Sequence, residues 1–170
     1  MSFELSTDAE WTYDELESAA TTLVAGEHDR IANAANISSL IYHSVPRLNW
    51  VGFYLFDGTE LVVGPFQGKP ACVRIPLDRG VCGAAARTRR TQRVADVHAV
   101  SDHIACDAES RSELVVPLVA DDGTLIGVFD VDSPDADRFS DDDQQGLEAV
   151  AAVYVRSLQA DRRKPWTAAR

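Results

Sequence analysis

The sequence is poor in lysine, in cysteine and in long apolar segments, and each shortage excludes a class of protein. Lysine accounts for two of the 16 basic residues, and 27 acidic residues give the 170-residue chain a formal net charge of -11. That charge opposes binding to nucleic acid and to anionic membrane surfaces. No apolar run approaches the roughly 18 residues that a membrane-spanning helix needs. We therefore expect a protein that binds neither nucleic acid nor membrane.

Aspartates form two short runs, at 121–122 and 141–143. An acidic surface of this kind is either an ordinary solvated surface or an adaptation to high salt, where charges are screened. The sequence leaves both explanations open.

The three cysteines argue against a secreted disulfide framework, because an odd number cannot pair completely within one chain. A chain of this length buries roughly two thirds of its unfolded surface and needs no covalent staples. No basic segment, apolar run and cleavage site opens the sequence, so we expect a cytoplasmic location. We expect one domain over 1–161 and a flexible C-terminal tail over 162–170.

The hydrophobic periodicity predicts helices on either side of a strand meander. One helix lies between a Thr12–Glu15 capping box and Gly26, and a second ends at Pro46. A short helix begins at Gly80, and the last helix begins at Ser140. Strands are predicted at 50–56, 61–66, 73–76, 92–95, 113–118 and 124–132. The fold class is therefore α+β, an antiparallel β-sheet with helices packed on it.

The cysteines all lie in one polar, glycine-rich third of the chain. Glycines flank Cys82, and His103 precedes Cys106 by three residues within a long loop over 96–111. Structural cysteines usually sit in apolar elements, whereas reactive ones lie near polar groups that stabilise a thiolate. Loops of this length are commonly functional. This pattern, which includes Cys72, favours thiol redox chemistry on a small ligand.

Five segments carry more specific motifs. They are residues 49–54 (NWVGFY), 64–72 (GPFQGKPAC), 80–83 (GVCG), 103–107 (HIACD) and 110–113 (SRSE). With the order of the predicted elements, these motifs resemble a GAF domain, and in particular the free methionine-(R)-sulfoxide reductases, over roughly residues 11–158.

The resemblance implies reduction of the R-epimer of free methionine sulfoxide, and not of methionine sulfoxide within proteins. It makes Cys106 the attacking thiol, Cys82 the main resolving thiol and Cys72 a further partner in disulfide exchange. It also implies a thioredoxin-type reductant and no bound cofactor or metal. The substrate-binding residues that it implies are Glu113, Asp130, Asp132, Trp50 and Tyr54.

Sulfoxide reduction needs a thiolate, a proton for the departing oxygen, and a second thiol that removes the sulfenic acid as a disulfide. Clustered carboxylates repel one another, so at least one of Glu113, Asp130 and Asp132 is expected to have a raised pKa. Another carboxylate, still ionised, is expected to bind the ammonium group of the substrate. The ring of Trp50 or Tyr54 is expected to pack against the S-methyl group of the substrate.

Structural roles for the same residues stay open. Trp50, Phe53 and Tyr54 are of types that are more often core aromatics than ligand contacts, Phe53 above all. Asp130 and Asp132 fit a strand end, and Glu113 fits an exposed edge. His98 and His103 fit loop positions without a chemical role. The start of a helix also lowers the pKa of a thiol, which alone would nominate Cys82 as the thiolate in place of Cys106.

Two other functions compete with reduction. One is a non-catalytic GAF module that senses a ligand or redox state, although sensors are commonly joined to an output domain. The other is a zinc site built from Cys72, Cys82, Cys106 and His103, whose gaps of nine and 23 residues between cysteines differ from the short paired spacings of structural zinc sites. The oligomeric state is open, and a homodimer is compatible with the sequence.

Overall fold

The computed structural model describes residues 11–99 and 109–159. In chain order the elements are α1 (Tyr13–Leu23), α2 (Arg30–Ser44), β1 (Trp50–Phe56), β2 (Leu61–Gly68), β3 (Arg74–Ile75), α3 (Gly80–Thr88), β4 (Gln92–Val94), the 3-10 helix η1 (Val97–Ala99), β5 (Ser112–Val119), β6 (Leu125–Ser133) and α4 (Asp141–Gln159). The predicted α+β class is confirmed. The proposed tail at 162–170 lies outside the described residues.

The six strands form one sheet in the order β3-β2-β1-β6-β5-β4, and each neighbouring pair is antiparallel. The two predicted hairpins, β1–β2 and β5–β6, are confirmed. They meet where β1 pairs with β6 at the centre of the sheet. This pairing joins residues about 70 to 80 positions apart and brings the β1 side chains next to β6, which carries part of the site described below.

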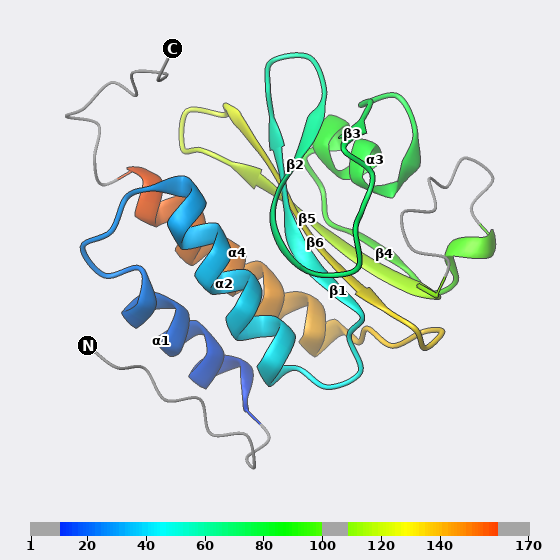
Figure 1. The fold of residues 1–170 in the computed structure, drawn as a ribbon, viewed down its shortest axis with the longest axis horizontal. Helices are drawn as coiled ribbons and strands as arrows, with labels where there is room; N and C mark the ends of the chain where they lie inside the picture. Colours follow the sequence, from blue (N-terminus) through cyan, green and yellow to red (C-terminus); the bar gives the residue numbers. More distant parts are fainter. Residues whose placement is uncertain (1–10, 100–108, 160–170) are drawn as a thin grey trace.

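Side-chain alternation gives the central strands two different buried faces. On β1, Val51 and Phe53 belong to the larger core under α1, α2 and α4, and Phe53 contacts the rings of Phe129 and Tyr154 with centroids 4.9 and 4.5 Å away. Trp50 and Tyr54 belong to a second cluster with α3. Figure 1 shows the three long helices side by side, with α3 set apart from them beyond the sheet.

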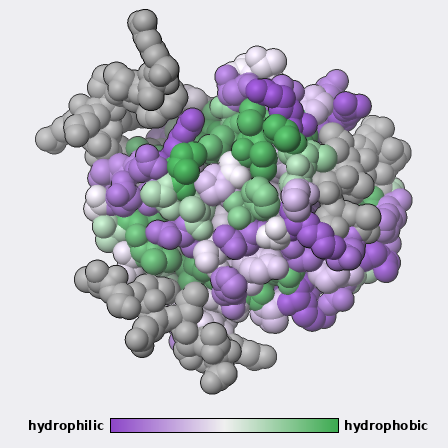
Figure 2. Space-filling view, in the orientation of Figure 1, coloured by the Kyte–Doolittle hydropathy of each residue, from purple (hydrophilic) through white to green (hydrophobic). Residues whose placement is uncertain are grey.

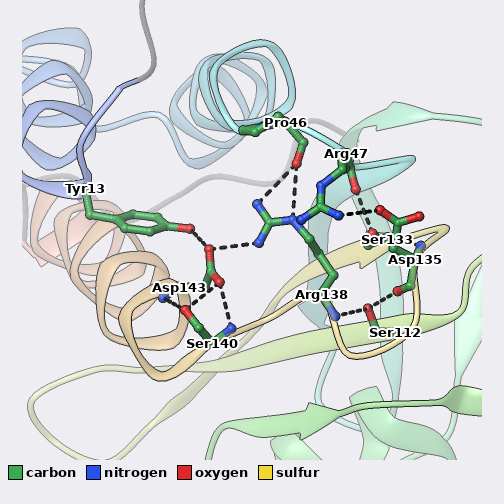
Figure 3. A network of polar contacts seen from close by, with 9 residues as sticks. All are labelled: Tyr13, Pro46, Arg47, Ser112, Ser133, Asp135, Arg138, Ser140 and Asp143. Carbon is green, nitrogen blue, oxygen red and sulfur yellow. Dashed lines mark hydrogen bonds and ion pairs between the residues drawn. The ribbon is translucent and has the colours of Figure 1, made fainter.

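A buried polar network fastens the start of α4 to α1 (Figure 3). Ser140 and Asp143 form the helix cap: the backbone N–H and the hydroxyl of Ser140 each donate to Asp143 Oδ2 at 2.7 Å. Tyr13 donates its hydroxyl to Asp143 Oδ1 at 2.6 Å, and Arg138 donates to the same oxygen at 3.1 Å. Four donors thus converge on one carboxylate.

Burial alone would raise the pKa of the Asp143 carboxyl, but the hydrogen bonds from Tyr13, Ser140 and Arg138 outweigh burial and lower the pKa to about 2. Packing supports the same contact, because a Cβ at Gly146 would collide with the Tyr13 ring. A glycine about one turn after Asp143 therefore lets the Tyr13 ring pack closely against α4.

The surface seen in Figure 2 carries hydrophilic and hydrophobic side chains intermixed. Among the described residues, Ile31 and Val73 are the large hydrophobic side chains that are exposed. Within 11–99 and 109–159, no helix combines the length and the apolar character needed to cross a membrane.

We predict that Asp143→Asn lowers the free energy of unfolding at neutral pH by about 2 kcal/mol, the scale of hydrogen bonds to a charged group. Because the folded pKa of about 2 lies below the ordinary value of 3.8, the ionised group stabilises the fold above roughly pH 4. That contribution is lost as the pH falls towards 2. Urea unfolding at a series of pH values measures it, with the exposed turn variant Asp121→Asn as control. A loss independent of pH would contradict the assignment.

Candidate active site

The candidate active site lies on the face of the sheet that α3 covers. Asp130 and Asp132 alternate with buried apolar residues on β6, so both carboxyl groups point to this face, as the sequence predicted. Glu113 on β5 is the direct cross-strand partner of Asp132, and Asp130 lies opposite Gly52 of β1. Glu113, Asp130 and Asp132 are all buried. The alternative of an exposed edge position for Glu113 is therefore wrong.

Cys82, on the first turn of α3, lies over these carboxyl groups. Its Sγ donates to Asp130 Oδ2 at 3.4 Å and lies 3.8 Å from Glu113 Oε1. A Cβ at Gly83, on the same turn, would lie 2.6 Å from the Pro76 carbonyl oxygen, so the glycine lets α3 pack closely against the segment that precedes it. The side chain of Cys82 is thus enclosed between α3, β5 and β6.

The pKa of Asp130 is raised well above its ordinary value of 3.8, mainly by burial and then by the charge of Glu113. Hydrogen bonds from the Cys82 thiol and the Val131 backbone oppose this shift only in part. The expectation that one of the clustered carboxyls has a raised pKa is confirmed. A protonated Asp130 can donate a hydrogen bond to a ligand oxygen.

The pKa of Cys82 is also raised well above its ordinary value, which corrects the expectation based on the helix start. Burial is the largest cause, followed by the charges of Asp130, Glu113 and Asp132. Cys82 does lie at the beginning of α3. The helix dipole is equivalent to about half a charge and is outweighed here by burial and nearby carboxylates. Cys82 is therefore a protonated thiol at neutral pH.

An aromatic stack forms the side of the site next to the carboxyl groups. The Trp50 ring stacks on Phe66 and Tyr54 with centroids 5.2 and 5.8 Å away, and its Nε1 donates to the Lys69 carbonyl. Gly52 makes room, because a Cβ there would lie 2.5 Å from the Trp50 ring. The two ligand-contact candidates, Trp50 and Tyr54, are 2% and 1% exposed. Their contact with substrate stays a prediction.

Of the other two cysteines, Cys72 lies next to this aromatic stack, which forms one wall of the site. Cys106 lies outside the described part of the chain. Cys72 is half-buried between β2 and β3, and its carbonyl accepts a hydrogen bond from the Tyr54 hydroxyl at 3.1 Å. Cys106 and His103 fall within 100–108, outside the described residues. Their roles stay predictions.

Two contacts that the sequence did not predict join residues 109 and 110, which follow the segment 100–108, to residues next to the Trp50 ring. Glu109 forms an ion pair with Lys69 at 2.6 Å, and Ser110 accepts a hydrogen bond from Asn49 at 3.0 Å. Asn49 directly precedes Trp50 in the sequence, and the Lys69 carbonyl accepts a hydrogen bond from the Trp50 ring. The one available signal was that Asn49, Lys69 and Ser110 all lie in the motif segments.

Residues 30–158 match the GAF domain model. The free methionine-R-sulfoxide reductase of Escherichia coli is 49% identical over 146 residues, which cover 86% of this chain and 88% of that protein. The fRMsr of Staphylococcus aureus, in a structure with its substrate, is 50% identical with a TM-score of 0.81, covering 86% of this chain and 95% of the other. A Burkholderia vietnamiensis protein described as a GAF sensor is 65% identical with a TM-score of 0.85, covering 89% and 96%.

The chain therefore belongs to the GAF domain family, and within it to the family that contains the free methionine-R-sulfoxide reductases. The resemblance stated from the motifs is confirmed.

We predict that Asp130→Asn raises the free energy of unfolding at neutral pH. Below about pH 3.8 the folded and unfolded chains both hold the proton of Asp130, so wild type and variant should have similar stability. As the pH rises above that value, only the unfolded chain loses the proton and the wild-type fold is weakened. Each pKa unit of this shift is worth about 1.4 kcal/mol, so the gain in the free energy of unfolding at neutral pH measures the size of the shift.

Urea unfolding of Asp130→Asn and of the exposed control Asp121→Asn, between about pH 4 and pH 7, tests the sign. Equal stability of wild type and Asp130→Asn at neutral pH would contradict the prediction, because it would show that the buried carboxyl group does not lower the free energy of unfolding.

Proposed function

We propose that this protein reduces the R-epimer of free methionine sulfoxide to methionine. The observation that carries the proposal is the buried contact between Cys82, Asp130 and Glu113, in a chain of the family that contains these reductases. A resolving thiol and a carboxyl group with a raised pKa are what sulfoxide reduction requires beside an attacking thiolate.

In the proposed reaction the Cys106 thiolate attacks the substrate sulfur while Asp130 gives its proton to the sulfoxide oxygen. The resulting hydroxyl group passes to the Cys106 sulfur as the transient sulfur–sulfur bond breaks, so methionine leaves and the cysteine becomes a sulfenic acid. Cys82 then attacks the Cys106 sulfur, which gives a disulfide and releases water. Cys72 exchanges with this disulfide. A thioredoxin-type dithiol supplies two electrons and two protons that restore the thiols, so the cycle requires no bound cofactor.

The carboxyl cluster supports specific roles in substrate binding. Asp130 Oδ1 is buried and has no hydrogen-bond partner among the described residues, while Oδ2 accepts from Cys82. A protonated Asp130 can thus turn a donor towards the sulfoxide oxygen. We assign the substrate ammonium to the remaining carboxylates, Glu113 and Asp132, and the S-methyl group to the Trp50 and Tyr54 wall.

Cys82 is suited to resolution and poorly suited to the first attack. Burial and the neighbouring carboxyl groups keep its thiol protonated, so it is a weak nucleophile at rest. When it attacks a sulfenic acid, Asp130 has already given its proton to the sulfoxide oxygen and lies 3.4 Å away, where it can accept the thiol proton. This geometry supports the assignment of the attacking role to Cys106. A reducing compartment such as the cytoplasm fits a cycle that starts from free thiols.

We predict turnover of free L-methionine-(R)-sulfoxide, with little activity on the S-epimer or on a methionine sulfoxide peptide. A carboxyl cluster that binds a free ammonium group has no such partner in a peptide. The assay supplies each substrate with thioredoxin, its reductase and NADPH, and follows the loss of NADPH. A sensor without catalytic activity would bind the R-epimer without consuming reductant, and equal rates on free and peptide-bound substrate would contradict the specificity.

We predict that Cys106→Ser abolishes methionine release, whereas Cys82→Ser releases one equivalent and then stalls with a sulfenic acid or a Cys72 disulfide. Rapid quench without reductant measures release per enzyme, and mass spectrometry of the quenched protein identifies the oxidised cysteine. If Cys106→Ser released methionine at the wild-type rate and Cys82→Ser released none, the two roles would be reversed.

A further inference from the structure

We propose that Cys82 Sγ, Glu113 Oε1 and Asp130 Oδ2 form a binding site for Zn²⁺, and that zinc bound there reversibly inhibits the protein. The three ligand atoms come from α3, β5 and β6 and lie within 4.8 Å of one another. Binding is independent of the proposed reductase activity, whereas inhibition rests on that activity. The site differs from the alternative considered in the sequence analysis, because Cys82 is joined by carboxylates and not by Cys72 or His103.

The distances fit tetrahedral zinc. With a zinc–sulfur bond of about 2.3 Å and a zinc–oxygen bond of about 2.0 Å, the sulfur and oxygen ligands of a tetrahedral ion lie roughly 3.5 Å apart. The Cys82 sulfur lies 3.4 Å from Asp130 Oδ2 and 3.8 Å from Glu113 Oε1. An ion can therefore enter between the three atoms with only small side-chain movements.

Asp130 gives independent evidence that the cluster is not satisfied by protein contacts alone. It is 6% exposed, and its second carboxyl oxygen, Oδ1, has no hydrogen-bond partner within the described parts of the chain. Buried carboxyl oxygens are normally hydrogen-bonded or bound to a metal. The same carboxyl group contacts Cys82 through Oδ2, so the unpartnered oxygen belongs to the cluster.

The donor set selects zinc over the common hard cations. Calcium takes six to eight oxygen ligands and magnesium keeps an octahedral oxygen shell, whereas one thiolate and two carboxylates suit a borderline-soft ion. Three protein ligands leave the fourth tetrahedral position open, which is typical of exchangeable and catalytic zinc and not of structural zinc. The ion would thus be able to leave the site.

Inhibition follows from which groups the ion occupies. A zinc–sulfur bond replaces the Cys82 S–H bond, a zinc–oxygen bond replaces the Asp130 O–H bond, both protons pass to solvent, and no electrons move. The thiol assigned to resolution is then blocked. Zinc also occupies the carboxyl groups assigned to the sulfoxide oxygen and the ammonium, so substrate and metal should compete.

The binding test uses Co²⁺ as a spectroscopic probe on the full-length reduced protein. We expect one equivalent of Co²⁺ to produce a thiolate-to-cobalt charge-transfer band, and one equivalent of Zn²⁺ to remove it. Cys82→Ser should abolish the band. Asp130→Asn and Glu113→Gln should weaken Co²⁺ binding at least about 10-fold, the lower limit found when even an outer-shell partner is lost.

Matched controls keep this result specific. Cys72→Ser removes a thiol outside the cluster, and Asp121→Asn removes a carboxylate on an exposed turn, so both should keep the band and its midpoint. Thermal unfolding of every variant identifies loss of fold, and Asp130→Asn is expected to be at least as stable as wild type. A band that survives in Cys82→Ser, or that disappears in Cys72→Ser or Cys106→Ser, would overturn the site.

A separate activity test distinguishes the two proposals. Zinc should abolish wild-type turnover of free methionine-(R)-sulfoxide, EDTA should restore it, and higher substrate concentration should raise the zinc concentration required. A normal cobalt band without turnover in metal-free buffer would sink the proposed reductase function and leave the metal site standing. Turnover that is insensitive to zinc, with no cobalt band, would sink the metal site alone.

Discussion

Placing Asp130 beside Glu113 and Cys82 inside the protein is the constraint that the rest of the structure has to meet. Each of these groups is disfavoured as an ion in a buried position, and two carboxyl groups so close together cannot both ionise without repulsion. The strands that carry them also carry the larger core on their other face. On β6, Phe129 and Val131 belong to that core, while Asp130 and Asp132 between and after them belong to the site. The sheet can hold an energetically unfavourable polar face because its other face packs into the larger hydrophobic core.

Asp130 and Asp143 show that burial alone does not decide the pKa of a carboxyl group. The two residues are 6% and 8% exposed, yet the pKa of Asp130 is raised and that of Asp143 is lowered to about 2. Asp143 accepts hydrogen bonds from a phenol, a serine and an arginine, whereas Asp130 faces another carboxylate and a thiol. Donors stabilise the charged form and a like charge destabilises it. One carboxylate fastens helices together, and the other is available for chemistry.

The local parts of this arrangement could be predicted from the sequence, and the long-range parts could not. Strand alternation placed Asp130 and Asp132 on one face, and Ser140 indicated the start of α4. The pairing of β1 with β6 could not be derived, because nothing in either segment specifies a partner so distant in sequence. The position of α3 over β5 and β6 was equally hidden, so the pKa of Cys82 was judged from its own helix and the sign was wrong. The close approach of Trp50 to Gly52 depends on the same tertiary packing.

The raised pKa of Cys82 gives a physical reason for dividing the work between thiols. Two thiolates at one site would both be open to oxidation, and the enzyme could close a disulfide without turning over substrate. A thiol held protonated by burial and carboxylates is inactive until a sulfenic acid forms next to it, because a sulfenic sulfur is a far better electrophile than a thioether or a sulfoxide. In the cycle proposed above, Asp130 has two roles: it donates a proton while the oxygen leaves, and accepts one when Cys82 attacks. In the proposed cycle, the carboxyl group that weakens the fold therefore also sets the order in which the cysteines react.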